Sequence, residues 1–162
     1  MRRLVDSVSP SRSFHPPCQG SLVTDVLSPP EEDFVRAQRV ARMATADAHG
    51  LPFVVPVCFV YLNGRLYTAV DEKPKSGKRL KRLRNIEANP QVAFVFDRYD
   101  DDWERLAWVL VQGHASLVTD KREKAQALAA LRSKYEQYDS MALERLPLIR
   151  VDPEHAANWG AL

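Results

Sequence analysis

The chain has 162 residues, the length of one typical domain, and it is long enough to bury a hydrophobic core. Apolar residues make up 45% of it and charged residues 27%, a composition that argues against general disorder. The 23 basic and 21 acidic side chains nearly cancel, so a net charge of +2 gives no argument for nucleic acid or an anionic membrane as a partner. No run of 18 apolar residues occurs, which argues against a membrane span.

The first residues differ in composition from the rest of the chain. Residues 1–27 are rich in Ser, Pro, Arg and His without a sustained period, and we interpret them as a mobile leader before a single domain over 28–162. No apolar segment follows the basic start as it would in a signal peptide, so we expect a cytoplasmic protein. Cys18 and Cys58 match no metal or redox spacing, which favours two reduced thiols.

The first half of the domain reads as one helix followed by strands. A helix is expected from Ser28 to about Arg39, because a capping Ser, two prolines and Glu31 are typical of a helix start. Asn63-Gly64 is the pair most typical of a tight β-hairpin turn. The three strands expected here, which would form an antiparallel meander, cover 40–45, 52–62 and 65–70.

The second half alternates helices and strands. Gly113 marks a possible β-bulge in a long strand, and Trp159 falls in a tail after the last strand. Six mostly antiparallel strands with two or three helices predict an α+β, mainly β, domain whose sheet closes into a small barrel, since closure removes exposed edges. The elements expected here are a helix over 76–88, strands over 91–97 and 106–118, a helix over 120–134 and a short strand over 148–151.

The sharpest local feature is a basic segment. Seven of the twelve residues from Lys73 to Arg84 are basic and none is acidic, and the segment runs from a loop into a helix whose first amides also favour an anion. It has neither the glycines of a phosphate-binding loop nor those of a dinucleotide fingerprint. A phosphate-bearing ligand, a solvated basic face and a nucleic-acid surface all remain open at this point, although no aromatic or amide side chains stand beside the charges to read bases.

Other clusters give weaker signals. The acidic loop 97–105 lacks the spacing of a calcium loop, so a solvated turn is expected there. Trp103 and Trp108 could wall a flat ring or, for Trp108, pack in the core. The four histidines are scattered, which indicates no metal site, and no Gly-x-Ser-x-Gly motif is present. If the protein is an enzyme, a cofactor is therefore expected to supply the reactive group.

Several short sequence segments, taken in their order along the chain, resemble one known group of proteins. The chain is similar to the flavin-binding split-barrel superfamily, the relatives of pyridoxamine 5′-phosphate oxidase, over about residues 31–160. Within that superfamily it resembles the actinobacterial branch of coenzyme F420-dependent oxidoreductases. The phrases that carry the resemblance are Gly50-Leu51-Pro52, Asn63-Gly64, Val70-Asp71-Glu72-Lys73-Pro74-Lys75, Arg84-Asn85-Ile86, Asn89-Pro90-Gln91-Val92 and Asp97-x-Tyr99-x-x-Asp102-Trp103.

The resemblance implies a homodimer of six-stranded split barrels with two sites at the subunit interface, and no role for nucleic acid or membranes. The cofactor ring would lie along a barrel strand, flanked by Val54, Val55, Pro56 and Val57. Three tryptophans, Trp103, Trp108 and Trp159, are candidates to shape the substrate cavity. Candidates for the cofactor phosphate and its attachments are Thr68, Lys73, Lys75, Lys78, Arg79 and Arg82.

The activity implied is hydride transfer between reduced or oxidised F420 and a small unsaturated organic substrate. FMN is the alternative cofactor, in an FMN-dependent oxidase or reductase, and a non-catalytic flavin or deazaflavin carrier would use the same residues. A long basic segment suits F420 better, because its phosphodiester is followed by a polyglutamate tail. The chain ends at Leu162 without the C-terminal Arg and His pattern of the vitamin B6 oxidases, so that reaction is not expected. The sequence selects neither the substrate nor a proton donor.

Overall fold

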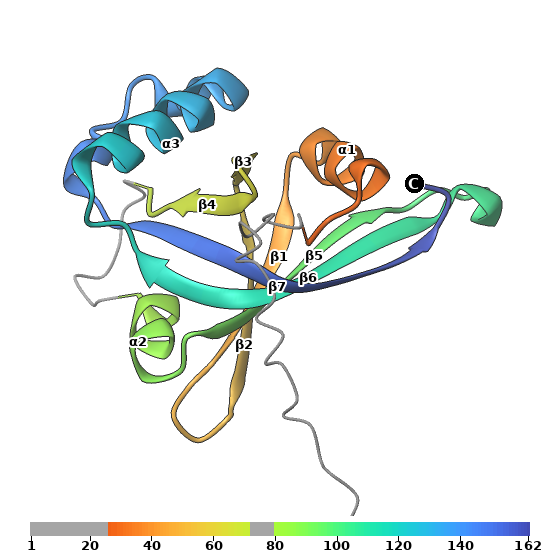
Figure 1. The fold of residues 1–162 in the computed structure, drawn as a ribbon, viewed down its shortest axis with the longest axis horizontal. Helices are drawn as coiled ribbons and strands as arrows, with labels where there is room; N and C mark the ends of the chain where they lie inside the picture. The colour runs from red at the N-terminus through yellow and green to blue at the C-terminus, as the bar shows by residue number, and fades with distance from the viewer. Residues whose placement is uncertain (1–25, 72–79) are drawn as a thin grey trace, which may run out of the picture.

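One antiparallel sheet dominates the computed structural model, which describes residues 26–71 and 80–162 (Figure 1). Within these residues seven strands form the sheet: β1 Ala41–Ala46, β2 Pro52–Val57, β3 Val60–Leu62, β4 Arg65–Ala69, β5 Gln91–Arg98, β6 Ala107–Leu117 and β7 Leu148–Gly160. The helices are α1 Pro29–Ala37, α2 Lys81–Ala88 and α3 Lys121–Lys134, with single turns η1 Trp103–Arg105, η2 Glu136–Tyr138 and η3 Leu143–Arg145.

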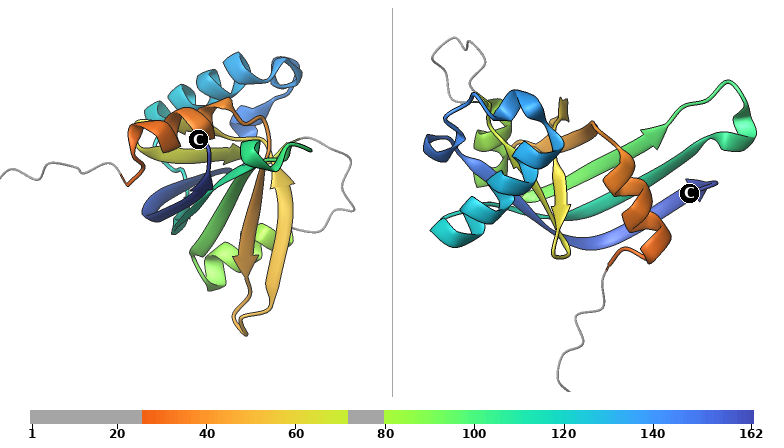
Figure 2. Two further views of the ribbon diagram at one scale, coloured as in Figure 1. Left: turned by 90° about the vertical axis from the view of Figure 1, so that its right-hand side faces the viewer. Right: turned by 90° about the horizontal axis from the view of Figure 1, so that it is seen from above.

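The order of the strands explains why the sheet curls. Across the sheet the order is β2-β1-β5-β6-β7-β4-β3, so β2 and β3 are its two edges. Only Cys58 and Phe59 separate these edge strands along the chain. The three Cα–Cα steps from Val57 to Val60 span about 11 Å at most, so the two edges must approach each other and the sheet bends into a half-barrel (Figure 2).

The strand count and one connection differ from the prediction. The apolar stretch 52–62 forms two strands, of which β2 pairs with β1 and β3 pairs with β4, so the predicted meander of three strands is wrong. The last strand is also longer than the expected 148–151. It continues through the predicted tail to Gly160, with Trp159 opposite Trp108 of β6. The strand is this long because its backbone pairs with β6 from one end of β6 to the other.

Local signals in the sequence agree with the structure. Ser28 N donates to Glu31 Oε2 at 2.8 Å in the expected capping box. Asn63 and Gly64 both have positive φ, 52° and 75°, as the tight turn requires. Gly113 lies at the predicted bulge, where an added Cβ would stand 2.3 Å from the carbonyl oxygen of Asp152. Leu27, the last residue of the predicted leader, is buried in the core; residues 1–25 lie outside the described residues.

Two hydrophobic clusters lie on the two sides of the curled sheet. The larger one fills the barrel and includes Phe59, Phe94 and Phe96, covered by α1 and α2. The smaller one lies between α3 and the β3–β4 hairpin, around Leu128 and Leu131. No helix among the described residues has the length and apolar character needed to cross a membrane.

The crossing from β2 to β3 is stabilised by one tyrosine. Phe59 is fully buried and stands between the two strands, outside both ladders. Its amide donates to the Tyr135 hydroxyl at 3.0 Å, and the single hydrogen of that hydroxyl is shared between the carbonyl oxygens of Phe59 and Arg39, each at 2.9 Å. A buried peptide group without partners is costly, so this hydroxyl allows the chain to leave one sheet edge for the other.

We expect Tyr135→Phe to lower the free energy of unfolding by about 2–4 kcal/mol, because it strands the buried amide and carbonyl of Phe59. Urea unfolding followed by fluorescence measures the change. Tyr99→Phe is the control, since Tyr99 is 74% exposed and should change stability little. Equal stability of the two variants would contradict the role given to Tyr135.

Candidate functional site

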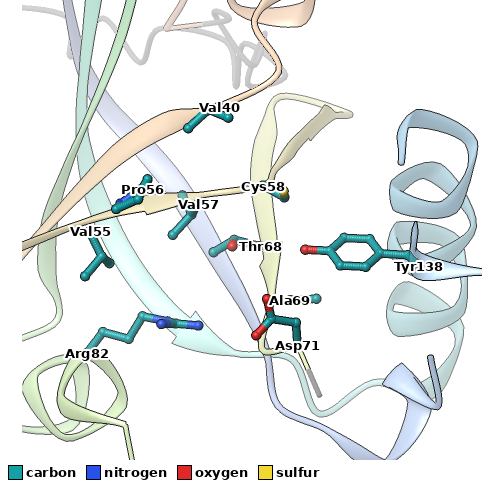
Figure 3. A pocket seen from close by; sticks show the side chains of 10 residues that line it. All are labelled: Val40, Val55, Pro56, Val57, Cys58, Thr68, Ala69, Asp71, Arg82 and Tyr138. Atoms are coloured by element: carbon teal, nitrogen blue, oxygen red, sulfur yellow. The ribbon is translucent and has the colours of Figure 1, made fainter. Parts of the chain in front are cut away.

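A pocket of about 430 Å³ opens where the two sheet edges meet α2. Its walls come from the end of β2, the end of β4, the first turn of α2 and η2. Figure 3 shows Arg82 extending into it from α2 and Tyr138 from the opposite side, with Thr68 between them. The residues that line it are Val40, Val55, Pro56, Val57, Cys58, Thr68, Ala69, Asp71, Arg82 and Tyr138.

Thr68 presents a hydroxyl with an unmet hydrogen-bonding capacity. It is 1% exposed on β4, opposite Ile149, and its Oγ1 has no hydrogen-bond partner in the described part of the chain. The other buried threonine behaves differently: Thr45 Oγ1 accepts from Asn85 Nδ2 at 3.0 Å. Because a buried hydroxyl without a partner destabilises the fold, the Thr68 hydroxyl indicates a ligand atom at this place.

Arg82 carries the second unmet group. Its Nε is buried and also lacks a partner among the described residues. Burial lowers the pKa of its guanidinium, while Asp71 and Tyr138 act in the opposite direction. A guanidinium at the first turn of a helix, beside an unpartnered hydroxyl, is a suitable pair of donors for a phosphate.

Tyr138 and Cys58 form the opposite wall. The Tyr138 ring is 5% exposed and tilts against Tyr135, with centroids 5.5 Å apart. Burial, with a hydrogen bond and an electrostatic contribution from Cys58, raises the pKa of the Tyr138 hydroxyl, so it stays protonated. Tyr138 therefore presents a neutral hydroxyl on this side of the pocket.

The structure brings together five of the residues predicted to bind a cofactor. Val54 is not among the residues that line the pocket, and it is 57% exposed. Four predicted residues, Lys73, Lys75, Lys78 and Arg79, lie outside the described residues. The five that share the pocket are Val55, Pro56, Val57, Thr68 and Arg82.

The three predicted cavity tryptophans lie elsewhere. Trp103 is in η1, after β5, and Trp108 and Trp159 pair across β6 and β7 at the end of the sheet near the C-terminus (Figure 1). None of them is among the residues that line the pocket. Trp103 and Trp159 are 75% and 53% exposed, so within one chain they form an exposed aromatic edge.

Five lining residues were not predicted from the sequence: Val40, Cys58, Ala69, Asp71 and Tyr138. Asp71 belongs to one of the segments that carry the family resemblance, and no local sequence pattern indicated a binding role for the others. Tyr138 reaches the pocket only because η2 follows α3 and packs beside the β2–β3 crossing. Such a position depends on tertiary structure rather than on spacing.

Comparison with known proteins identifies the family to which the chain belongs. The family model described as pyridoxamine 5′-phosphate oxidase matches residues 28–160. The chain is 32% identical over 132 residues to 5a,11a-dehydrotetracycline/5a,11a-dehydrooxytetracycline reductase of Streptomyces rimosus, an alignment that covers 80% of each chain. The chain therefore belongs to the pyridoxamine 5′-phosphate oxidase family.

Solved structures agree on the split-barrel fold. A conserved hypothetical protein of Mycobacterium tuberculosis has a TM-score of 0.68 at 18% identity, covering 87% of this chain and 90% of that one. The heme storage protein HutZ of Vibrio cholerae has a TM-score of 0.63 at 22% identity, covering 80% and 90%. A FAD-binding protein of Mesorhizobium loti has a TM-score of 0.61 at 22% identity, covering 78% and 87%. At these identities the likeness concerns the fold alone.

The two buried threonines give a matched test of the pocket. We expect Thr68→Val to raise the free energy of unfolding of the ligand-free protein by about 1 kcal/mol, because it removes an unpartnered hydroxyl without changing the shape of the side chain. Thr45→Val should lower it by about 1–2 kcal/mol, because the Asn85 amide loses its acceptor. Urea unfolding of both variants measures the difference, and destabilisation of similar size in both would show that Thr68 is already satisfied.

Proposed function

We propose that this protein is an oxidoreductase that binds coenzyme F420 and transfers a hydride between this deazaflavin and a small unsaturated organic substrate. The observation that carries the proposal is the pair of buried, unpartnered polar atoms, Thr68 Oγ1 and Arg82 Nε, that faces one pocket of a family member. A redox reaction is supported by the reductase to which the chain is 32% identical.

Thr68 and Arg82 would bind the cofactor phosphate. The residues fit this group because phosphate oxygens accept from both a hydroxyl and a guanidinium, and Thr68 Oγ1 and Arg82 Nε are the buried side-chain atoms that lack partners in the described chain. Their positions on β4 and α2 place them on adjoining walls of the pocket. Both side chains would then be fully hydrogen-bonded in the complex.

The strand β2 would hold the ring. It is an edge strand, paired only with β1 in the described sheet, so its other side offers backbone donors and acceptors to the polar atoms of a flat ring. Val55 and Val57 add apolar walls that exclude water. When bound, the deazaflavin supplies the hydride acceptor or donor, and the protein positions it.

The choice of F420 over FMN rests on the sequence. Seven basic residues between Lys73 and Arg84 form a track longer than one phosphate monoester requires, and they suit a phosphodiester that continues into a polyglutamate tail. Lys81, Arg82 and Arg84 of this track lie on α2. An FMN-dependent oxidase or reductase and a non-catalytic carrier are the alternatives that the binding and turnover experiments below separate.

The site would be completed in a homodimer. Val54 of β2 and Leu51, just before this strand, do not line the pocket and are each 57% exposed. Exposed apolar side chains beside an unpaired strand edge favour a covering partner. A second copy on this surface would shield the ring and could bring the exposed Trp103 and Trp159 toward its neighbour's pocket.

Parallel titrations of the full chain with F420 and FMN, followed by ligand fluorescence, test the cofactor. We expect micromolar or tighter binding of F420 and weaker binding of FMN. Arg82→Met should weaken F420 binding by about tenfold or more, because a charge-assisted contact to phosphate is lost. Arg145→Met, which removes an exposed arginine of η3, is the control and should leave affinity unchanged.

The outcomes separate the alternatives. Preference for FMN would assign the protein to the FMN-dependent group, and binding of neither cofactor would refute the role of Thr68 and Arg82. Binding of F420 without consumption of the reduced cofactor over a panel of unsaturated acceptors would favour a carrier. Hemin is included as a third ligand, because HutZ shares the fold.

For the dimer, light scattering at micromolar concentration should give twice the chain mass of 18.4 kDa. Val54→Glu should shift the protein toward monomer and weaken F420 binding, because a carboxylate would be buried at the interface. Ala129→Glu, on the exposed face of α3, adds the same charge as a control. A monomeric wild-type chain with full cofactor affinity would contradict a shared site.

A further inference from the structure

Lys134, the last residue of α3, stands in unusual surroundings for a lysine. Its side chain is half-buried, and Nζ lies 4.1 Å from the centre of the Phe59 ring and 5.7 Å from that of Tyr135. The ammonium donates one hydrogen bond, to the carbonyl oxygen of Arg36 at 3.2 Å. No carboxylate pairs with it in the described part of the chain.

Two arginines are the charged neighbours that act on Lys134, and one of them, Arg36, forms an ion pair with Glu32 at 3.2 Å. Arg39 stacks on the Tyr135 ring at 5.3 Å and donates to the backbone carbonyl of Lys134 at 2.9 Å. Arg36, from α1, shares a groove with Lys134. The other titratable group that acts on it, the Cys58 thiol, favours the ammonium but does not outweigh burial and the two arginines, which lower the pKa of Lys134 to about 8.

The groove beside the amine has a volume of about 420 Å³. It is separate from the pocket around Thr68 and Arg82, with which it shares no lining residue. Its lining combines apolar side chains of β3 and α3 with two basic side chains. Its lining residues are Arg36, Val60, Tyr61, Leu62, Ala130, Ser133 and Lys134.

We propose that Lys134 is a nucleophilic amine and the site at which small acyl phosphates acylate this protein. Desolvation and adjacent cations are the two conditions that activate a lysine as a nucleophile. The arginines attract the anionic donor, and the apolar wall receives its acyl group. The amine lone pair attacks the carbonyl carbon, the bond from carbon to the phosphate oxygen breaks, inorganic phosphate leaves with the electron pair, and the nitrogen gives its proton to water.

Another lysine of the same helix provides a matched control. Lys124 is also half-buried, but its ammonium donates to the carbonyl oxygens of Glu144 and Leu146 at 2.9 and 2.8 Å. Lys121 is exposed at the start of the helix. Differences in reactivity between Lys134 and Lys124 therefore report on local chemistry rather than on burial.

The full chain is incubated with acetyl phosphate between pH 6.5 and 10, and acetylation of each lysine is followed by peptide mass spectrometry. We expect Lys134 to react about tenfold faster than Lys124 or Lys121 at pH 7.5, because more of its amine is unprotonated. Its rate should level off above pH 8, where the amine of Lys134 is largely unprotonated. No rate advantage, or a profile without the bend near pH 8, would overturn the proposal.

A second pair of variants tests the role of the neighbouring charge. Arg39→Gln should slow acetylation of Lys134 by acetyl phosphate severalfold, whereas Arg122→Gln, which removes an exposed arginine at the start of α3, should not. With the uncharged reagent N-hydroxysuccinimidyl acetate the effect of Arg39→Gln should be smaller, because no donor anion is attracted. Equal rates in the two variants with acetyl phosphate would remove the anion-attracting role.

Discussion

The structure depends on how the chain crosses from β2 to β3 within two residues. These strands are opposite edges of one sheet, so the crossing forces the sheet to curl. It also leaves the buried peptide groups of Phe59 without a partner in either strand ladder. The Tyr135 hydroxyl binds both the amide and the carbonyl of Phe59. A residue just after α3 thus stabilises the point at which the sheet becomes a half-barrel.

The same crossing creates the pocket. Val57 and Cys58 come to it as the chain leaves β2, and Thr68 comes from β4, the hairpin partner of β3, so these residues meet only because the two edges meet. Tyr138 follows Tyr135 by three residues, and their rings contact each other. The interaction that satisfies Phe59 therefore also positions the neutral hydroxyl of Tyr138 at the pocket. Fold and site share one tertiary arrangement.

The sequence predicted those features that are decided locally. The capping box at Ser28, the Asn63-Gly64 turn and the bulge at Gly113 each depend on a few adjacent residues, and all three are present. The division of 52–62 was not predictable, because its apolar run is continuous and the break arises where the sheet curls. The length of β7 was missed for a similar reason: its polar second half is a strand only because β6 lies beside it.

The candidate site, like the fold, was predictable from the sequence only in part. Thr68 and Arg82 were suggested by family phrases and by the basic segment, but the sequence did not show that their polar atoms would be buried without partners. For stability alone, valine would serve better than threonine at position 68, as the satisfied Thr45–Asn85 pair shows by contrast. An unmet hydroxyl and an unmet guanidine nitrogen in one pocket are most simply explained by a ligand that satisfies both. A phosphate of either F420 or FMN would remove the cost of burying these two polar atoms without partners.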